Sequence, residues 1–220
     1  MMVVREKFEF ELNGVQEQFL LLSNLAITTL NKSIDALLSQ DVEMALSIID
    51  NDIHINRLEE EINDRVILLL AKQQPVATDL RRLIVLIKAA HDMERVGDYA
   101  VNIAKEAIRI GKAEFVAPIK NIEEMRIITI GMLTEVMKAF IDENVEQARK
   151  IAELDDKVDN LYGQTIQQLL KVGSENPLLL SQVTQLSFVC RYLERSADHA
   201  TNIAEELFYL VKGRHYELNN

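Results

Sequence analysis

The chain has 220 residues, a formal net charge of −11, and a composition that is 48% hydrophobic but only 5% aromatic. This length can bury a substantial core in one large domain or two small ones, and the few glycines and prolines favour long helices over sheets. The negative charge argues against binding to nucleic acid and against general attraction to anionic lipid, because both reward basic surfaces.

The sequence also indicates a cellular compartment. Cys190 is the only cysteine, so no intrachain disulfide can form, and a lone thiol fits a reducing environment. The first residues lack the apolar core of a signal peptide, and the longest apolar run, VILLLA at residues 66–71, is far shorter than a membrane span. We therefore expect a soluble, intracellular protein in which Cys190 is a small core residue.

Three helices are predicted in the first half, over residues 8–37, 41–72 and 77–110. In the first of these, apolar side chains recur at steps of three and four residues, which is the period of an amphipathic helix. Asp41 is the expected N-cap of the second helix, and the sequence QQP at residues 73–75 ends it. Gly111 suits a left-handed cap at the end of the third helix.

Residues 111–118 form the expected connection to three further helices, over residues 119–142, 145–172 and 177–212. Gly173 follows the fifth helix, and Asn176 with Pro177 is typical of an N-cap followed by the first helical position of the sixth. That helix should end near Gly213, and residues 214–220 are expected to fray.

The two halves of the sequence repeat. With an offset of 103 residues, LNKSIDALLSQDVEMA aligns with LTEVMKAFIDENVEQA, and with an offset of 100, ERVGDYAVNIAKE aligns with ERSADHATNIAEE. The change of offset predicts a shorter turn between the second and third helices of the second half. We therefore predict an all-α fold of two tandem three-helix bundles, residues 1–112 and 113–220.

Each half carries acidic side chains one helical turn apart, although like charges at this spacing repel each other. Antiparallel packing should bring the acids of the third and sixth helices opposite a polar pair on the second and fifth helices. The first cluster comprises Asp52, Asn56, Glu94, Asp98 and Asn102. The second cluster comprises Asp155, Asp159, Glu194, Asp198 and Asn202.

Clustered carboxylates are costly unless protons or a cation neutralise them. A donor set made only of oxygens suits hard cations such as magnesium, manganese, calcium or iron. Gly97 and Ala197 keep the position before each aspartate small, so that a neighbour can approach the backbone there. The alternative interpretation is that the acids are solvated or paired with basic side chains, and Arg95 and Arg195 are placed to neutralise them.

An enzyme is the less favoured interpretation. Di-iron helical bundles use two Glu-x-x-His motifs, but here the order is reversed at His91 and Glu94, and Arg191 stands where a second histidine would be needed. His199 follows Asp198 without that spacing. The sequence contains no glycine-rich phosphate loop, no HExxH and no GxSxG. Nothing in it specifies catalysis.

Several stretches together resemble one family. AKQQPVATDLRRL at residues 71–83, DMERVGDYAVNIA at 92–104 and RYLERSADHATNIAE at 191–205 are similar to the PhoU family of bacterial phosphate-signalling regulators. The resemblance covers essentially the whole chain and implies two three-helix bundles. It also implies that iron, manganese, magnesium or zinc binds at the acidic clusters, through the family's E/D-x-x-x-D pattern. Asn56 departs from that pattern and removes one charge from the first cluster.

The resemblance further implies a function. Family members restrain the phosphate-starvation response, acting with a sensor histidine kinase and the ATPase subunit of a phosphate ABC transporter at the cytoplasmic face of the membrane. The expected protein is therefore a cytoplasmic regulator rather than an enzyme, a homodimer that reaches the membrane only through its partners. A di-metal enzyme built on a helical bundle and a structural adaptor that needs no metal remain the alternatives.

Overall fold

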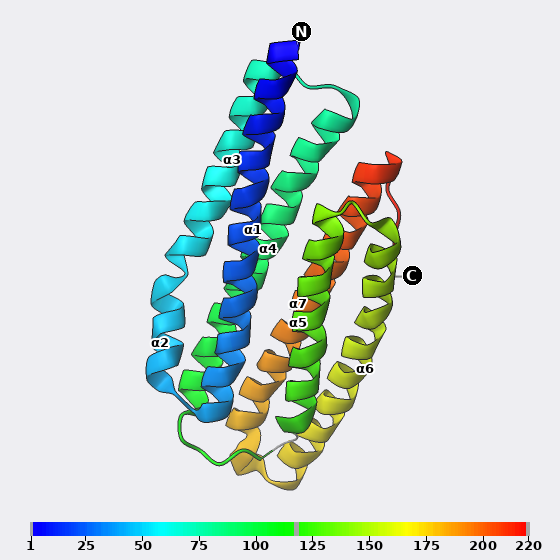
Figure 1. The fold of residues 1–220 in the computed structure, drawn as a ribbon. Helices are drawn as coiled ribbons and strands as arrows, with labels where there is room; N and C mark the ends of the chain where they lie inside the picture. The colour runs from blue at the N-terminus through cyan, green and yellow to red at the C-terminus, as the bar shows by residue number, and fades with distance from the viewer. Residues whose placement is uncertain (1, 117–118, 219–220) are drawn as a thin grey trace.

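The computed structural model describes residues 2–116 and 119–218, and these form helices and short connections with no strand (Figure 1). The all-α prediction is therefore confirmed for the described residues. The elements are α1 (Met2–Ser39), α2 (Val42–Asn51), α3 (Ile53–Gln73), α4 (Ala77–Ile110), α5 (Ile119–Ile141), α6 (Val145–Glu175), a 3-10 turn η1 (Pro177–Leu179) and α7 (Leu180–Lys212).

The predicted starts of two helices are confirmed, and a side-chain N-cap marks each of them at equivalent positions of the repeat. The side chain of Asp41 accepts a hydrogen bond from the backbone N–H of Met44 at 2.9 Å, at the start of α2. Asn144, which the offset of 103 relates to Asp41, accepts one from the N–H of Gln147 at 3.1 Å, at the start of α6. Each cap satisfies a backbone donor that the first turn of a helix leaves free.

The second predicted helix is wrong as a single element, because α2 ends at Asn51 and α3 begins at Ile53. At the break, the N–H of Asp52 lies 3.5 Å from the carbonyl oxygen of Ile49, three residues back. A regular helix would use the carbonyl four residues back. The sequence has no proline or glycine at this point to signal the interruption.

Three glycine predictions have different outcomes. Gly213 ends α7 in the left-handed region at φ 71° and ψ 16°, whereas Gly111 has φ 60° but an extended ψ of −134° and is not the predicted left-handed cap. Gly173 does not end its helix, because α6 continues to Glu175. A Cβ at Gly173 would lie 2.9 Å from Cδ2 of Leu180, so its role is to let α7 begin close to α6.

The fraying predicted after α7 is also wrong for the residues that the structure describes. Residues 214–218 fold back, and the backbone N–H of Leu218 donates a hydrogen bond to Oε1 of Glu205 at 2.8 Å. Tyr216 and Leu218 are half-buried. Residues 219 and 220 lie outside the described part of the chain.

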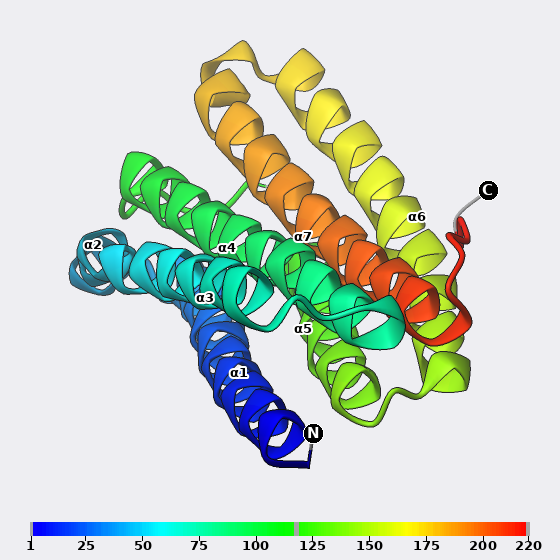
Figure 2. The ribbon, with the colours of Figure 1, turned by 90° about the horizontal axis from the view of Figure 1, so that it is seen from above.

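The helices form two layers. Figure 2 shows α3, α4, α7 and α6 side by side in one curved layer, with α1 and α5 packed beneath it. The buried side chains of all these helices make one continuous apolar core, to which Cys190 belongs. Burial raises the pKa of the Cys190 thiol to about 12, which keeps the thiol protonated and unreactive. No helix among the described residues is long and apolar enough to span a membrane.

The antiparallel pair of α4 and α7 joins the two halves. His199 Nδ1 of α7 lies 2.7 Å from Asp92 Oδ1 of α4, and the rings of Tyr99 and Tyr192 stack with their centroids 5.9 Å apart. The offset of 100 relates Asp92 to Tyr192 and His199 to Tyr99. The two contacts therefore occupy equivalent places in a repeated arrangement, and they differ in chemistry.

Candidate functional site

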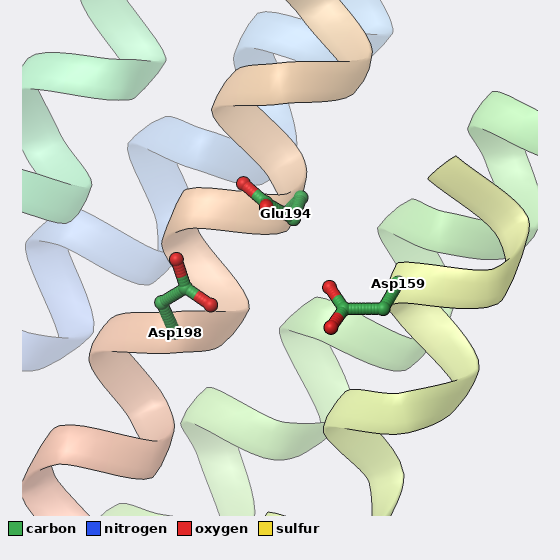
Figure 3. A group of neighbouring side chains, drawn as sticks. All are labelled: Asp159, Glu194 and Asp198. Carbon is green, nitrogen blue, oxygen red and sulfur yellow. The ribbon is translucent and has the colours of Figure 1, made fainter. Parts of the chain in front are cut away.

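Three carboxylates of the second cluster converge between α6 and α7. Asp159 of α6 faces Glu194 and Asp198 of α7, and one oxygen from each residue lies within 4.8 Å of the others (Figure 3). Asp159 and Asp198 are exposed, whereas Glu194 is half-buried. We refer to these three residues as the acidic triad. Their oxygens are close enough to bind one ion together.

The acidic triad is short of positive charge. Burial raises the pKa of all three carboxyl groups, and the charge of a neighbouring aspartate raises each further: Asp156 acts on Asp159, Asp198 on Glu194, and Asp159 on Asp198. Arg191 Nη1 lies 3.2 Å from Glu194 Oε1 and supplies a partial counter-charge. Oε2 of Glu194 is buried and has no hydrogen-bond partner among the described residues. A buried acceptor of this kind is stabilised by a cation or a proton.

The other two predicted members of the second cluster lie elsewhere. Asp155 is one turn earlier on α6, with 1% of its surface exposed. Asn202 does not join the acidic triad, because its Nδ2 lies 3.4 Å from Oδ1 of Asp92 on α4. It lines an open groove between α4 and α7 together with Lys88 and Glu206, whose charged atoms are 2.7 Å apart. The structure thus does not bring Asn202 together with the acidic triad, and its role as a ligand stays a prediction.

A positively charged side chain, that of Arg95, lies within the first cluster. Arg95 Nε lies 2.6 Å from Glu94 Oε2, and Nη2 lies 2.7 Å from Oε1, so the guanidinium and the carboxylate make a two-point contact. Arg95 Nη1 also lies 2.7 Å from Asp98 Oδ2. The alternative prediction, that Arg95 neutralises the acids, is confirmed.

Helix α3 completes the first cluster. Asn56 Nδ2 lies 3.3 Å from Asp52 Oδ2. The pKa of Asp52 is raised mainly by burial and then by the charge of Asp98. Oδ1 of Asp52 and Oδ1 of Asn56 are buried without a hydrogen-bond partner among the described residues. Asn102, one turn beyond Asp98, is half-buried.

The two arginines at equivalent positions have different partners. Arg195 is exposed, and the neighbouring Tyr99 of α4 is the main cause of the raised pKa of its guanidinium. The residue related to Tyr99 is His199, which is engaged with Asp92. Arg95 pairs with two acids of its own helix. In the second cluster it is Arg191 that pairs with a member of the acidic triad, at 3.2 Å from Glu194, and no ion pair of Arg195 with the acidic triad is seen among the described residues.

The small residue at position 97 is explained by packing. A Cβ on Gly97 would lie 2.9 Å from Cδ1 and 3.0 Å from Cγ2 of Ile55. Ile55 is buried and follows Asp52 by one turn of α3. The close approach predicted at this position is thus made by a side chain of the neighbouring helix, and it holds α3 against the acids of α4.

The histidines do not add to the clusters. His199 Nδ1 contacts Asp92 on α4, and His91 is exposed. The acidic triad contains no histidine, so the described residues do not reproduce the Glu-x-x-His geometry of di-iron bundles. Sequence reasoning did not identify Asp92, Tyr99 or Tyr192 as important. The available signal was that the repeat places unlike residues at these equivalent positions.

Comparison with known proteins agrees with the repeat. The model of the PhoU domain matches the chain twice, at residues 19–107 and 122–207. The phosphate-specific transport system accessory protein PhoU homolog of Clostridium acetobutylicum is 36% identical over 219 residues, which are 99% of this chain and 100% of that protein. The phosphate-specific transport system accessory protein PhoU of Escherichia coli is 30% identical over 210 residues, covering 96% of this chain and 87% of that protein.

Solved structures agree as well. The crystal structure of PhoU from Pseudomonas aeruginosa superposes with a TM-score of 0.91 at 32% sequence identity, and covers 94% of this chain and 100% of that chain. The crystal structure of the phosphate transport system regulatory protein PhoU from Streptococcus pneumoniae gives a TM-score of 0.89 at 30% sequence identity, and covers 95% of this chain and 99% of that chain. The order and packing of all the helices are therefore shared with these proteins.

Proposed function

The chain belongs to the PhoU family, and on that basis we propose that it regulates phosphate uptake as an accessory protein of a phosphate transport system. The proposal is supported by the length of the similarity, because relatives bearing that description match over 96% to 99% of this chain. It is also supported by the structural match to a protein described as a phosphate transport system regulatory protein.

The mode of action we propose is contact with other proteins. The partners would be the ATPase subunit of a phosphate ABC transporter and a sensor histidine kinase, met in the cytoplasm by a homodimer of this chain. Supporting this, the outer layer of α3, α4, α7 and α6 offers a broad surface of packed helices (Figure 2). Phe188 is 45% exposed on α7 and stacks against Tyr192, which puts aromatic surface near the acidic triad. Aromatic side chains are enriched where proteins bind each other.

The acidic triad is proposed to bind one hard divalent cation. The observation that carries this proposal is the convergence of three carboxylates, one of which, Glu194, also has a buried Oε2 without a hydrogen-bond partner among the described residues. Carboxylate oxygens fit magnesium, manganese or iron better than zinc, which favours nitrogen and sulfur. When bound, such an ion would supply the missing positive charge and link α6 to α7. In the first cluster Arg95 already supplies charge, so we propose weaker binding there.

The cation proposal is tested by manganese binding to protein prepared without chelating resin, using isothermal titration calorimetry. The variant Asp159→Asn/Glu194→Gln should lose most of the affinity. The matched variant Glu94→Gln/Asp98→Asn, which changes the equivalent first cluster, should retain it. Equal affinity for manganese in all three proteins would show that the acidic triad is not the binding site.

The regulatory proposal is tested separately, in a bacterial host that lacks its own accessory protein and carries a reporter of phosphate starvation. The wild-type chain should lower the reporter signal in phosphate-rich medium, and the Asp159→Asn/Glu194→Gln variant should not. Failure of the wild-type chain would oppose the regulatory function. Equal activity of wild type and variant would keep the regulatory function and exclude a role for the cation in it.

A further inference from the structure

One positively charged side chain of this protein lies beside the acidic triad. Arg191 precedes Glu194 by one turn of α7, and its Nη1 is 3.2 Å from Oε1 of Glu194. Its Cζ is 5.9 Å from the ring centroid of Tyr162, which follows Asp159 by one turn of α6. The guanidinium of Arg191 therefore has two partners, a carboxylate on its own helix and an aromatic ring on the facing helix.

The charge of Arg191 acts on every member of the acidic triad. Burial is the main cause of the raised pKa of all three carboxyl groups, and the charge of Arg191 opposes that rise in each of them. Among the described residues, however, Glu194 is the only acid within ion-pair distance of Arg191. One guanidinium thus offsets only part of the charge of three carboxylates.

Arg191 and a bound cation would compete with each other. A cation held by the acidic triad needs an oxygen of Glu194, whose carboxylate Arg191 already contacts. The ion would also lie close to the guanidinium, and like charges repel. Binding of a cation to the acidic triad is therefore opposed by Arg191 for as long as the guanidinium stays on Glu194.

The contact between Arg191 and Glu194 can be released more easily than the contacts of Arg95. Arg95 touches two acids of its own helix at distances of 2.6, 2.7 and 2.7 Å. Arg191 has one contact of 3.2 Å, and its side chain is 42% exposed. Ion pairs this exposed contribute little to stability. The ring of Tyr162 also gives the guanidinium a cation–π partner that it can keep after Glu194 is withdrawn.

The first half of the repeat lacks this arrangement. The offset of 100 relates Arg191 to His91, which is exposed. The offset of 103 relates Tyr162 to Glu59, whose carboxylate accepts a hydrogen bond from Asn63 at 2.6 Å. Neither an arginine nor an aromatic ring stands at these two places, so the pair of Arg191 and Tyr162 is specific to the acidic triad.

We propose that Arg191 is an intramolecular competitor of the cation at the acidic triad and sets the cation concentration at which this site fills. The inference rests on the cation site put forward under the proposed function. At low cation concentration the guanidinium stays on Glu194 and partly neutralises the acids. When a cation binds, the guanidinium leaves Glu194 and remains on the ring of Tyr162. Filling of the site thereby moves a charged side chain at the surface between α6 and α7.

The first test is manganese binding measured by isothermal titration calorimetry. Arg191→Met keeps much of the apolar stem and should bind manganese about tenfold more tightly than the wild type, because one nearby like charge is removed. Arg191→Lys keeps the charge and should stay within about threefold of the wild type. The matched control Arg195→Met removes the same charge from an exposed side chain, and should change the affinity by about threefold or less.

The second test follows the release of the guanidinium. The chain has no tryptophan, so the fluorescence of a Tyr162→Trp variant reports on that one ring. Magnesium is the probe, because manganese is paramagnetic and quenches fluorescence. Adding magnesium should change the emission when Arg191 is present, and the change should be lost in Tyr162→Trp/Arg191→Met. No change with Arg191 present, or an equal change in both proteins, would overturn the release onto the ring.

Two calorimetric results would overturn the competition. The first is an Arg191→Met protein with native helix content and wild-type affinity for manganese. The second is a gain in affinity that persists when Asp159→Asn/Glu194→Gln is added, since Arg191 would then act elsewhere. If Arg191→Met does not fold, Arg191→Gln takes its place with the same expected outcomes. Wild-type affinity that is unchanged by Asp159→Asn/Glu194→Gln alone would instead overturn the proposed cation site, so the two failures are distinct.

Discussion

Replacing Arg95 by methionine should convert the first cluster from a self-neutralised group into one that needs a cation. The substitution keeps much of the apolar stem but removes the guanidinium that contacts Glu94 at 2.6 Å and Asp98 at 2.7 Å. Two carboxylates would then face each other and Asp52 with no positive group between them. Carboxylates in that situation either take up protons or bind a metal ion.

The size of the effect follows from how exposed the groups are. The side chain of Arg95 is 40% exposed, whereas those of Glu94 and Asp98 are 11% and 33% exposed. Exposed ion pairs contribute roughly 0–1 kcal/mol, and breaking a fully buried pair costs about 3–5 kcal/mol. For this intermediate case we expect the free energy of unfolding to fall by about 1–2 kcal/mol. In a domain of this size that corresponds to a melting temperature lower by roughly 2–8 °C.

The loss should depend on pH. Burial already raises the pKa of Glu94 above its usual value in the presence of Arg95, and removal of the arginine raises it further. A carboxyl group whose pKa is higher in the folded than in the unfolded state binds more protons when folded, so its contribution to stability is lost as the pH rises. The variant should therefore approach wild-type stability near about pH 4 and differ most near about pH 7.

Differential scanning fluorimetry with and without manganese measures both effects. Manganese at about 100 times its dissociation constant would add roughly 2.7 kcal/mol to the variant and restore its melting temperature. Arg195→Met is the matched control, because that side chain is exposed beside Tyr99, and the change should stay within about 0.5 kcal/mol. A variant at Arg95 that melts at the wild-type temperature and gains no response to manganese would refute this reasoning.

Four further predictions concern packing, pH and reactivity. Gly97→Ala should destabilise the chain by about 1–3 kcal/mol in urea titrations, because Ile55 would lie 2.9 Å from the new Cβ. Gly163→Ala, at a helical position with open space around it, should stabilise it by about 0.5–1 kcal/mol. In the presence of a chelator, the raised pKa values of the acidic triad should make the free energy of unfolding fall as the pH rises above about 4. Asp159→Asn should make this fall with pH less steep, and an unchanged pH dependence in the variant would contradict the prediction. Cys190, buried and with its pKa raised to about 12, should react with a thiol reagent only on unfolding, and rapid reaction of the native chain would show that it is accessible.

The parts of the fold that the sequence predicts well are those set by local chemistry. Apolar spacing and the cap at Asp41 depend on residues close together in the chain, and the structure has a helix and a hydrogen bond there as expected. Asn176 accepts its capping hydrogen bond as well, but it caps the 3-10 turn η1, and α7 begins only at Leu180 rather than at the predicted residue 177. The break at Asp52 was not predictable from such signals, since no helix-breaking residue marks it. Gly173 was misinterpreted for a related reason. A glycine near a helix end can serve a cap or a close contact, and only the position of Leu180 shows which one applies.

The candidate site, too, was predictable from the sequence only in part. Repeated spacing was sufficient to bring Asp159 opposite Glu194 and Asp198, because that geometry follows from two neighbouring helices and a one-turn interval. The different partners of Arg95 and Arg195 were not predictable from spacing, because the two arginines stand at equivalent positions of the repeat and follow a glutamate in both halves. The same holds for Asn202, which turns to Asp92 rather than to the acids of its own half.

Two differences make the duplicated clusters unequal. Asn56 stands where the second half has Asp159, which removes a negative charge from the first cluster. Arg95 contacts both Glu94 and Asp98, whereas the equivalent Arg195 is exposed, so the first cluster also holds a positive charge between its acids. Both differences act in the same direction. The first cluster is brought closer to neutrality by groups that are part of the chain, whereas the acidic triad has three carboxylates and one paired arginine, Arg191. The proposed cation should therefore bind more tightly at the acidic triad than at the first cluster, although the two motifs are duplicates.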